Sequence, residues 1–398
     1  MKKKILLIMP SMFIGGAERS LLGLMEALDG ADWDISLFLY RHEGEFMKEI
    51  PAHVNLLPEM EAYRTFDVPI KSLLLSAKAP FGLARLASKA AIKAHCLRTG
   101  EKRGVWMSMQ YTARYLLPLL PDIPGEYDMA IMFLGVGDIL VHKVRAKAKL
   151  TWCHTDYDTL GPNRKMDRQT YCAVDRVVAV SEECAVKIRK FYPELAEKII
   201  VIENVIASRL GRKQALEPAA DLLRKPGETI LLSIGRYCEA KNFDNVPDIC
   251  SRLRQMGLNV KWYIIGYGGD EEKIRSQIAA TDMDEHVILL GKKENPYPYI
   301  KNCDLYVQPS RYEGKCVTVR EAQMLGKPVV ITRYATSASQ LEENVDGVIV
   351  PMDNEGCAQG IAALLRDPEK MARLSDACRN RDFSNRNQVE ILKDYLKE

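Results

Sequence analysis

The sequence lacks several features that often reveal the class of a protein. None of its ten cysteines forms a C-x-x-C pair with another, so neither a zinc ribbon nor a thioredoxin-type redox site is indicated, and we expect reduced cytosolic thiols. No uninterrupted apolar run approaches the roughly 20 residues that span a bilayer. The apolar run after the N-terminal lysines stops at Pro10 after about six residues, which is too short for a signal peptide. We therefore expect a cytoplasmic protein that is not integral to a membrane.

A large net charge is also lacking. The 56 Lys and Arg residues face 53 Asp and Glu residues, which leaves +3. A strong polyanion would have to be met by a local basic patch, and we expect no nucleic-acid partner. With 398 residues, 47% of them hydrophobic, the chain is long enough for two or three domains with large cores.

Acidic residues are absent from residues 68–100. In this stretch leucines are interleaved with six basic residues, Lys71, Lys78, Arg85, Lys89, Lys93 and Arg98. Such a segment can lie on an anionic membrane surface. It can equally be an ordinary helical insertion, at about 68–104, whose lysines are solvated and whose leucines pack on the domain. The sequence leaves both interpretations open.

The chain does contain a regular alternation of short apolar runs and helical patterns, which is typical of α/β proteins with mainly parallel sheets. Strands are predicted at 4–9, 34–40, 54–57, 127–134, 149–153, 176–180, 198–202, 229–234, 260–265, 286–290, 304–308, 328–332 and 347–350. The polar stretch 207–227 contains Pro218 and Pro226 and is the best domain boundary. The sequence therefore predicts two doubly wound, Rossmann-like domains, 1–206 and 207–380.

Conspicuous residues follow several of the predicted strands. Doubly wound sheets bind ligands at the carboxyl ends of their strands, so two such domains that face one another create a cleft for a ligand. The residues found at these places are Gly15, Gly16, His154, Arg236, Gly266 and Glu313.

The segment 308–330 is the most informative, because it reads as a strand end, a turn, a helix and the next strand. It contains Glu313 and Glu321 with seven residues between them. If Glu313 lies in the loop, the neighbouring amides and the helix N-terminus face a ligand while Glu321 points inward. An anionic or hydroxyl-rich ligand suits that arrangement.

These residues resemble those of a known family. Tyr312-Glu-Gly and the later REAQMLGKPVV, at 320–330, resemble the Glu-x7-Glu signature of the retaining glycosyltransferases of family 4, also called glycosyltransferase group 1. Three further elements match in order: IGGAER at 14–19, IGRYCEAKN at 234–242 and IGYG at 265–268. The resemblance covers nearly the whole chain and implies a GT-B fold of two facing Rossmann-like domains. Members of such folds commonly end in a helix that crosses back to the first domain, which we expect for 381–398.

The resemblance also implies roles for individual residues. The donor is a nucleotide-diphosphate sugar, and a UDP-sugar is favoured. Arg236 and Lys241 suit its two phosphate charges. Glu321 is implied to accept hydrogen bonds from the ribose hydroxyls, and Glu313 to lie by the donor sugar. The remaining donor-binding positions are Gly15, Gly16, Gly266, Gly314, Lys315, Cys316 and Val317.

On the acceptor side, the implied acceptor is a glycan or a lipid-linked glycan. His154 is expected to approach the donor sugar hydroxyls, and Asp156 or Asp158 to orient the acceptor hydroxyl. Lys315 stands where many members have Phe, which weakens inferences about donor selectivity.

Two Asp-x-Asp strings, 156–158 and 282–284, invite a metal interpretation. Enzymes of the family instead neutralise the leaving diphosphate with Arg, Lys and helix dipoles, so we expect no metal and no cofactor. Retention is then described as front-face attack, in which the leaving phosphate takes the acceptor proton.

For the biological role we expect synthesis of capsule, exopolysaccharide or another cell-surface polysaccharide, at the inner face of the plasma membrane. Three alternatives are open: a nucleotide-sugar epimerase with a GT-B-like fold, a phosphorylase that carries pyridoxal phosphate, and a non-enzymatic membrane-surface scaffold.

Overall fold

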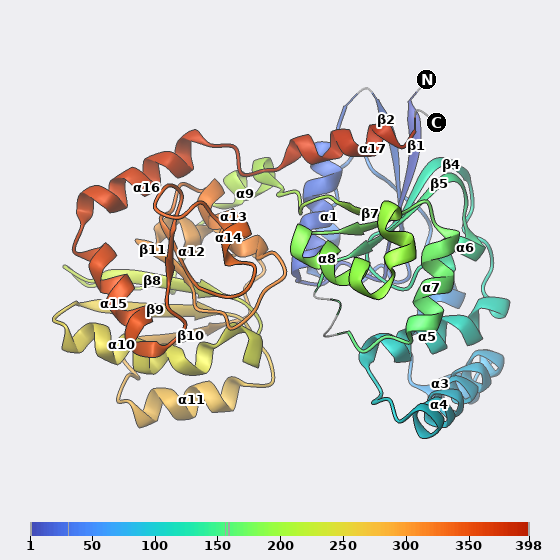
Figure 1. Ribbon diagram of the computed structural model, residues 1–398, viewed down its shortest axis with the longest axis horizontal. Coiled ribbons are helices and arrows are strands. Elements are labelled where there is room, and N and C mark those ends of the chain that lie inside the picture. The colour runs from blue at the N-terminus through green and yellow to red at the C-terminus, as the bar shows by residue number, and fades with distance from the viewer. Residues whose placement is uncertain (1, 31, 156, 158–159, 397–398) are drawn as a thin grey trace. The chain divides into compact units, whose positions relative to one another are not determined.

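A computed structural model of the protein describes residues 2–30, 32–155, 157 and 160–396. The chain forms two compact units, the first made of Met1–Val205 with Arg386–Glu398 and the second of Ile206–Asn385 (Figure 1). Each unit contains one parallel sheet covered by helices. The predicted α/β class with two Rossmann-like domains is therefore confirmed.

The first unit is built on a seven-stranded parallel sheet with the strand order β3-β2-β1-β4-β5-β6-β7. Its strands are β1 (Lys3–Met9), β2 (Trp33–Leu39), β3 (Asn55–Leu56), β4 (Glu126–Met132), β5 (Arg145–Cys153), β6 (Arg176–Ala179) and β7 (Ile199–Val201). Each overlaps one of the apolar runs predicted for this half. These runs are apolar nearly throughout, because helices cover both faces of a parallel sheet.

The helices of the first unit connect these strands. They are α1 (Gly16–Ala27), α2 (Glu61–Arg64), α3 (Ile70–Leu74), α4 (Ala79–Thr99), α5 (Val105–Leu116), α6 (Asp138–Lys143), α7 (Arg164–Ala173), α8 (Glu182–Phe191) and α17 (Glu390–Asp394), with 3₁₀ turns η1 (Glu45–Glu49), η2 (Leu117–Leu119), η4 (Pro193–Lys198) and η7 (Arg386–Val389). The predicted basic insertion thus forms α3 and α4. Helix α4 has Pro80 in its first turn and ends at Gly100, which adopts a left-handed φ of 73°. No helix in the described part of the chain is long and apolar enough to cross a membrane.

The second unit is built on a six-stranded parallel sheet with the order β10-β9-β8-β11-β12-β13. Its strands are β8 (Thr229–Ile234), β9 (Val260–Ile265), β10 (Val287–Gly291), β11 (Leu305–Gln308), β12 (Val329–Thr332) and β13 (Val348–Val350). Its helices are α9 (Ser208–Gln214), α10 (Val246–Gln255), α11 (Glu271–Ala280), α12 (Tyr297–Asn302), α13 (Val317–Met324), α14 (Ser337–Gln340), α15 (Asn354–Leu365) and α16 (Pro368–Asn380), with turns η5 (Glu239–Lys241) and η6 (Phe243–Asn245).

Alternate residues along these strands enter two different cores. Leu231 packs in a core with residues of α10, α11 and α15 on one face of the sheet. Its neighbours Ile230 and Leu232 pack with residues of α12 and α13 on the other face. This period of two is the geometry of a strand buried on both sides, and Figure 1 shows the helices on the two faces.

Both sheets share the order in which the first strand of the unit lies beside its second and fourth strands. The direction of winding therefore reverses between β1 and β4, and again between β8 and β11. In open α/β sheets such a switch point opens a crevice at the carboxyl ends of the strands, which is the usual place for a ligand.

The end of the chain is less helical than its apolar pattern predicted. Phe383 packs in the core of the second unit, and Asn385 adopts a positive φ of 55°. Only then does η7 begin, followed by the short helix α17. A left-handed residue interrupts a right-handed helix, so the predicted helix over 381–398 is wrong in its first residues. In the first unit, Lys393 of α17 pairs with Asp32 at 3.0 Å.

Candidate functional site

The loops that follow β8 and β9 are packed backbone to backbone. The Tyr237 N–H donates to the Tyr267 carbonyl at 2.9 Å. A Cβ on Gly266 would lie 1.9 Å from the Gly235 carbonyl oxygen, and one on Gly268 would lie 2.3 Å from the Tyr237 carbonyl oxygen. The close approach of these two loops therefore explains Gly266, which sequence reasoning assigned to donor binding.

Lys241 and Glu313 form an ion pair at the switch point of the second sheet. The Lys241 stem lies on Gly235, where a Cβ would be 3.0 Å from its Cε. Its Nζ donates to Glu313 Oε1 at 2.5 Å, and the two side chains are only 17% and 11% exposed. Burial alone would lower the pKa of Lys241, but the Glu313 charge outweighs it and raises that pKa above its usual value. Lys241 is therefore a permanent cation beside a carboxylate.

One oxygen of Glu313 is held on two sides. Ser310 Oγ donates to Oε1 at 2.6 Å, in addition to Lys241. Ser310 is held in turn by buried side chains. Gln308 Nε2 donates to Ser310 Oγ at 3.0 Å, and the Tyr306 hydroxyl donates to Gln308 Oε1 at 2.8 Å. Glu313 Oε2 has no hydrogen-bond partner among the described residues. The carboxylate is thus fixed at one oxygen and able to accept at the other.

Arg236 differs from its predicted companion Lys241. It is exposed and makes no hydrogen bond or ion pair within the described residues. Nearby Arg311, by contrast, is held by both oxygens of Asp244, each at 3.0 Å. Arg236 therefore keeps its five donors for an anion outside the protein, whereas the charge of Lys241 is shared with Glu313.

Glu321 lies inside helix α13, one turn and more beyond the loop that carries Glu313. Its side chain is buried, and its Oε1 accepts the Tyr297 hydroxyl at 2.7 Å. The Tyr297 ring packs against α9, where a Cβ on Gly211 would be 3.0 Å from it. Glu321 thus points inward, as its spacing predicts, and Tyr297 orients it.

The residues between Glu313 and α13 are held by a neighbouring segment. The Cys316 N–H donates to Gln340 Oε1 at 2.7 Å, and the Cys316 carbonyl accepts Gln340 Nε2 at 3.3 Å. Lys315 Nζ donates to the Ser339 carbonyl at 2.6 Å. Gly314 precedes these residues and Val317 opens α13. The Cys316 amide, one of the predicted donor contacts, is therefore occupied by a side chain.

In the first unit, Gly15 and Gly16 begin α1. Gly15 is its N-cap with extended backbone, and no side chain caps this helix. A Cβ on Gly15 would meet only the flexible Glu18 carboxylate, at 2.2 Å. The Glu18 carboxylate thus lies beside this helix N-terminus, and the phosphate contact of Gly15 and Gly16 stays a prediction.

His154 is drawn into the interior of the first unit. Its Nε2 donates to the Phe133 carbonyl at 2.8 Å. Burial lowers the pKa of His154 to about 4, although hydrogen bonds to Phe133 and to the Asn204 side chain oppose the shift. Asn204 in turn accepts from Ser20 Oγ at 3.0 Å. The imidazole is therefore neutral at pH 7 and ties strand ends together, which favours a structural role for it in this conformation. Asp156 and Asp158 lie outside the described residues.

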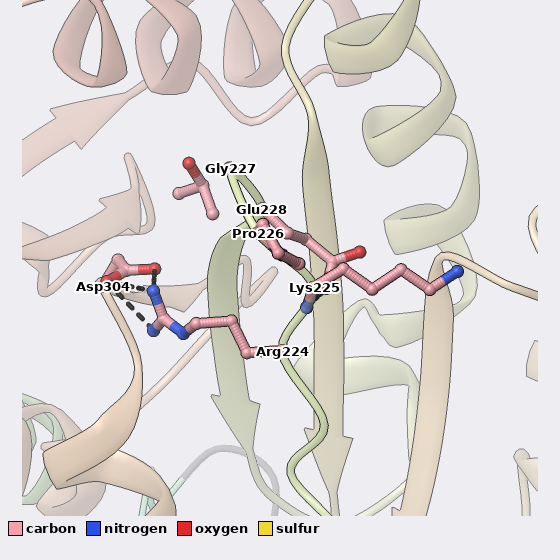
Figure 2. Close-up of a pocket in the computed structure, with 7 residues that line it drawn as sticks. Arg224, Lys225, Pro226, Gly227, Glu228 and Asp304 are labelled. Atoms are coloured by element: carbon pink, nitrogen blue, oxygen red, sulfur yellow. Dashed lines mark hydrogen bonds and ion pairs between the residues drawn. The ribbon is translucent and has the colours of Figure 1, made fainter.

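Two hollows occur away from these side chains. The larger, about 560 Å³, lies at the opposite end of the second sheet, where Arg224 reaches Asp304 and Lys225 points away from it (Figure 2). Asp304 also accepts the Ile230 N–H at 2.7 Å, so this ion pair fixes β8 beside β11. The smaller, about 260 Å³, lies in the first unit beside Arg164, which stacks over the Phe191 ring at 4.0 Å. No cluster of three metal-ligating side chains occurs in the described part of the chain.

Sequence reasoning missed four side chains that shape this site: Gln308, Ser310, Tyr297 and Gln340. Gln308 and Ser310 were detectable in principle, because they are polar residues at and just after the end of a buried strand. Tyr297 and Gln340 meet the site from other elements, and no local pattern marks them.

Comparisons with known proteins show what the second unit resembles. Residues 217–381 match the family model described as Glycosyl transferases group 1. The amylovoran biosynthesis glycosyltransferase AmsK of Erwinia amylovora is 34% identical over 177 residues, 41% of this chain and 41% of the relative. The N-acetylgalactosamine-N,N'-diacetylbacillosaminyl-diphospho-undecaprenol 4-alpha-N-acetylgalactosaminyltransferase of Campylobacter jejuni is 28% identical over 206 residues, 51% of this chain and 52% of the relative. The second unit is therefore similar to the glycosyltransferase group 1 domain, and the chain spans about half the length of these curated relatives.

The fold of the whole chain also matches a solved structure. The crystal structure of Anabaena HepE in complex with UDP-glucose superposes with a TM-score of 0.65 over 99% of both chains, at 17% identity. At that identity the similarity shows the fold alone. The two Rossmann-like units thus have the GT-B fold.

Proposed function

We propose that this protein is a retaining, metal-independent glycosyltransferase. It moves a sugar from a nucleotide-diphosphate sugar, with UDP-sugars as the favoured donors, to a hydroxyl of a glycan or lipid-linked acceptor. The observation that carries the proposal is the Lys241–Glu313 pair at a topological switch point, with the exposed Arg236 after the same strand β8, inside the range that matches the family model.

The chemistry follows from the charges at this site. The bond from the anomeric carbon to the diphosphate breaks, and negative charge grows on the leaving phosphate. Arg236 and Lys241 stabilise that growing charge, which lowers the barrier because the stabilisation is larger in the transition state than in the ground state. A bond to the acceptor oxygen forms on the same face, and the acceptor proton passes to the leaving phosphate.

Two side chains divide recognition of the donor. Glu313 Oε2 accepts a hydrogen bond from a sugar hydroxyl, because Oε1 is already held by Lys241 and Ser310. Glu321 accepts from the ribose, oriented by Tyr297. A carboxylate has the acceptor capacity that a vicinal diol requires.

The names of the relatives suggest the pathway. One acts in amylovoran biosynthesis and another on a diphospho-undecaprenol-linked glycan. We therefore propose a role in cell-surface polysaccharide synthesis, with a lipid-linked acceptor at the inner face of the plasma membrane.

A screen of donor binding tests the activity. Thermal shifts and hydrolysis are measured with UDP, GDP and ADP sugars, with and without EDTA, because a ligand that binds the folded state raises its melting temperature. We expect one nucleotide class to respond, EDTA to have no effect, and Glu321→Ala to weaken the response. Loss of the response in EDTA contradicts metal independence, and formation of an epimeric donor without acceptor favours the epimerase.

Helix α4 provides a surface for the proposed membrane association. Leu83 and Leu97 are 60% and 78% exposed. At helical spacing they form one exposed stripe with Ala87, Ala90 and Ala94, flanked by Lys89, Lys93 and Arg98. An exposed apolar stripe between basic side chains suits an anionic lipid surface.

Only some of the basic residues of this segment are available to a membrane. Lys78 pairs with Glu61, and Arg85 donates to the Thr65 carbonyl at 2.9 Å. Lys89 and Lys93 are exposed and have no partner within the described residues. A variant that removes charge should therefore change Lys89, Lys93 and Arg98.

Liposome flotation tests this surface. We expect wild-type protein to float with vesicles that contain anionic lipid, and Lys89→Gln/Lys93→Gln/Arg98→Gln to float less. The control Lys225→Gln/Lys301→Gln/Arg373→Gln removes the same charge from exposed positions of the second unit. If wild-type protein stays at the bottom of the gradient, the proposed membrane association is wrong. If both variants lose flotation equally, binding depends on the net charge of the protein and not on the α4 surface.

A further inference from the structure

Side chains join the loop that carries Glu313 to the segment after β12. Thr336 Oγ1 donates to the Glu313 carbonyl at 3.0 Å, and Lys315 Nζ donates to the Ser339 carbonyl at 2.6 Å. Gln340 makes paired contacts with the N–H and the carbonyl of Cys316. We call these contacts the loop clasp.

Gln340 is the central member of the loop clasp. Its side chain is buried, and it reaches Cys316 from another element of the fold, the end of α14. It accepts the Cys316 N–H at 2.7 Å and donates to the Cys316 carbonyl at 3.3 Å. Both polar groups of one peptide position are thus satisfied by one amide, which fixes the position and the orientation of the loop.

We propose that Gln340 is a positioning residue that sets sugar recognition, because the loop clasp decides where Glu313 Oε2 is presented. This inference rests on the proposed function. Lys241 and Ser310 hold Glu313 Oε1 from β8 and β11, whereas Thr336 holds the Glu313 carbonyl from the segment after β12. Glu313 is therefore held at its carboxylate and at its backbone carbonyl, and the backbone contact belongs to the loop clasp.

The loop clasp separates the sugar from the nucleotide. Glu321, the group assigned to the ribose, accepts the Tyr297 hydroxyl from α12, whereas Gln340 bonds to Cys316 in the loop before α13. Loosening Cys316 should consequently move the contact with the sugar and leave the contacts with UDP in place. If Gln340 served folding alone, its loss would weaken the contacts with the sugar and with UDP equally.

The first test compares UDP with UDP-sugars. In Gln340→Met the side-chain volume is kept and both hydrogen bonds are removed. The probe is whichever of UDP-glucose and UDP-N-acetylglucosamine the wild type binds. We expect the Kd of UDP to stay within about twofold, while the Kd of this UDP-sugar rises about tenfold. We expect kcat to fall by at least about tenfold as well. Thr336→Val removes one donor at nearly constant shape and should show a smaller effect in the same direction.

Gln323→Met is the matched control. Gln323 is buried in the same unit, and its Nε2 donates to the Asp346 carbonyl at 3.2 Å, away from the Glu313 loop. We expect it to lower the melting temperature as Gln340→Met does, with the ratio of UDP-sugar to UDP affinity unchanged.

Hydrogen exchange tests the loop clasp without any ligand. In Gln340→Met we expect the peptide that covers residues 313–317 to exchange at least about tenfold faster, because the Cys316 N–H loses its acceptor, and this peptide to be unchanged in Gln323→Met. Unchanged exchange in Gln340→Met overturns the loop clasp.

The outcomes separate the inference from the proposed function. Faster exchange with equal losses of UDP and UDP-sugar affinity, or with no loss, overturns the positioning role of Gln340. A wild-type protein that binds neither UDP nor any UDP-sugar overturns the proposed function and with it the role in sugar recognition. In that case hydrogen exchange still decides whether the loop clasp orders residues 313–317.

Discussion

The two units arrange their strands alike and hold different groups after the strands. In the second unit, a partly buried ion pair, Lys241–Glu313, and the exposed Arg236 follow the strands. In the first unit, His154 follows β5 and bonds to the Phe133 carbonyl and to Asn204, with its pKa lowered to about 4 by burial. One topology therefore holds an ion pair in one unit and a neutral imidazole in the other.

The same comparison extends to the helix that begins beside each site. Gln110 in the first unit accepts the Asn163 N–H at 2.8 Å and donates to the Asn163 carbonyl at 3.2 Å, just as Gln340 pairs with Cys316. Asn163 and Cys316 are the N-caps of α7 and α13. A buried glutamine thus fixes a helix start in both units, and in the second unit that helix follows the loop that carries Glu313. The lesson is that topology selects the place and side chains select the ligand.

The largest effect is expected from a variant that breaks the Lys241–Glu313 ion pair. In Lys241→Met, Glu313 keeps a partly buried charge without its cation, so we expect turnover to fall by about 10² to 10³ and stability by about 3 kcal/mol. Adding Glu313→Gln should restore the stability without the turnover, as measured by sugar transfer and by denaturant unfolding. Turnover close to wild type in Lys241→Met would remove the pair from the mechanism.

A smaller effect comes from the residue that orients Glu321. Tyr297→Phe removes the hydroxyl that donates to Glu321 Oε1, so the buried carboxylate loses a partner that contributes about 1–3 kcal/mol. We expect the Kd for UDP to rise about tenfold by calorimetry. Tyr263→Phe is the control, because that hydroxyl donates to the Leu223 carbonyl elsewhere in the unit. Equal losses in both variants would argue against orientation of Glu321.

The neutral imidazole of the first unit predicts a dependence on pH. His154 has its pKa lowered to about 4, so the unfolded state binds the proton more readily between about pH 6.5 and 4. Its contribution to stability is complete above pH 6.5 and is lost as the pH falls, by about 3 kcal/mol at most. Asp167 has the opposite effect on the pH dependence. Burial raises the pKa of that carboxyl to about 6, so its protonation as the pH falls stabilises the folded state.

The variant His154→Asn isolates the histidine, because Asp167 remains in both proteins. We expect the stability difference between wild type and variant to be larger at pH 7.5 than at pH 4.5, measured by urea unfolding of the first unit. A difference that does not change with pH would show that His154 titrates normally.

The smallest effect on donor binding is expected from the glutamine of the first unit. Gln110→Met removes the paired contacts with Asn163, and the first unit should melt at a lower temperature because two buried backbone groups lose their partners. The Kd for UDP should remain within about twofold. If Gln110→Met weakens UDP binding, Gln110 affects more than the first unit, and the comparison of the two glutamines fails.

Most of the fold was readable from the sequence because strand burial is a local signal. All thirteen predicted apolar runs contain strands, from β1 to β13, since a strand covered by helices on both faces must be apolar nearly throughout. The tail was misjudged because the positive φ of Asn385 is a backbone property that the apolar spacing of residues 389–396 does not reveal.

The candidate site was readable only in part. Glu313, Arg236 and Lys241 stand out because they come soon after buried strands, and Glu321 stands out by its spacing from Glu313. Their pairings did not: Arg236 and Lys241 looked equivalent, yet one is exposed and the other pairs with Glu313 across 72 positions of sequence. Tyr297 and Gln340 were missed for the same reason, since their partners lie 24 positions away.

By itself the sequence determined the α/β architecture with two parallel sheets and the identity of the charged residues at the strand ends. Periodicity and strand length are local properties, and they suffice for both. Tertiary structure alone decided which cation remains free, which oxygen of Glu313 can accept, and which glutamine holds the loop. Those outcomes depend on distances between segments far apart in the chain, and such distances are set only when the hydrophobic cores on both faces of each sheet are packed.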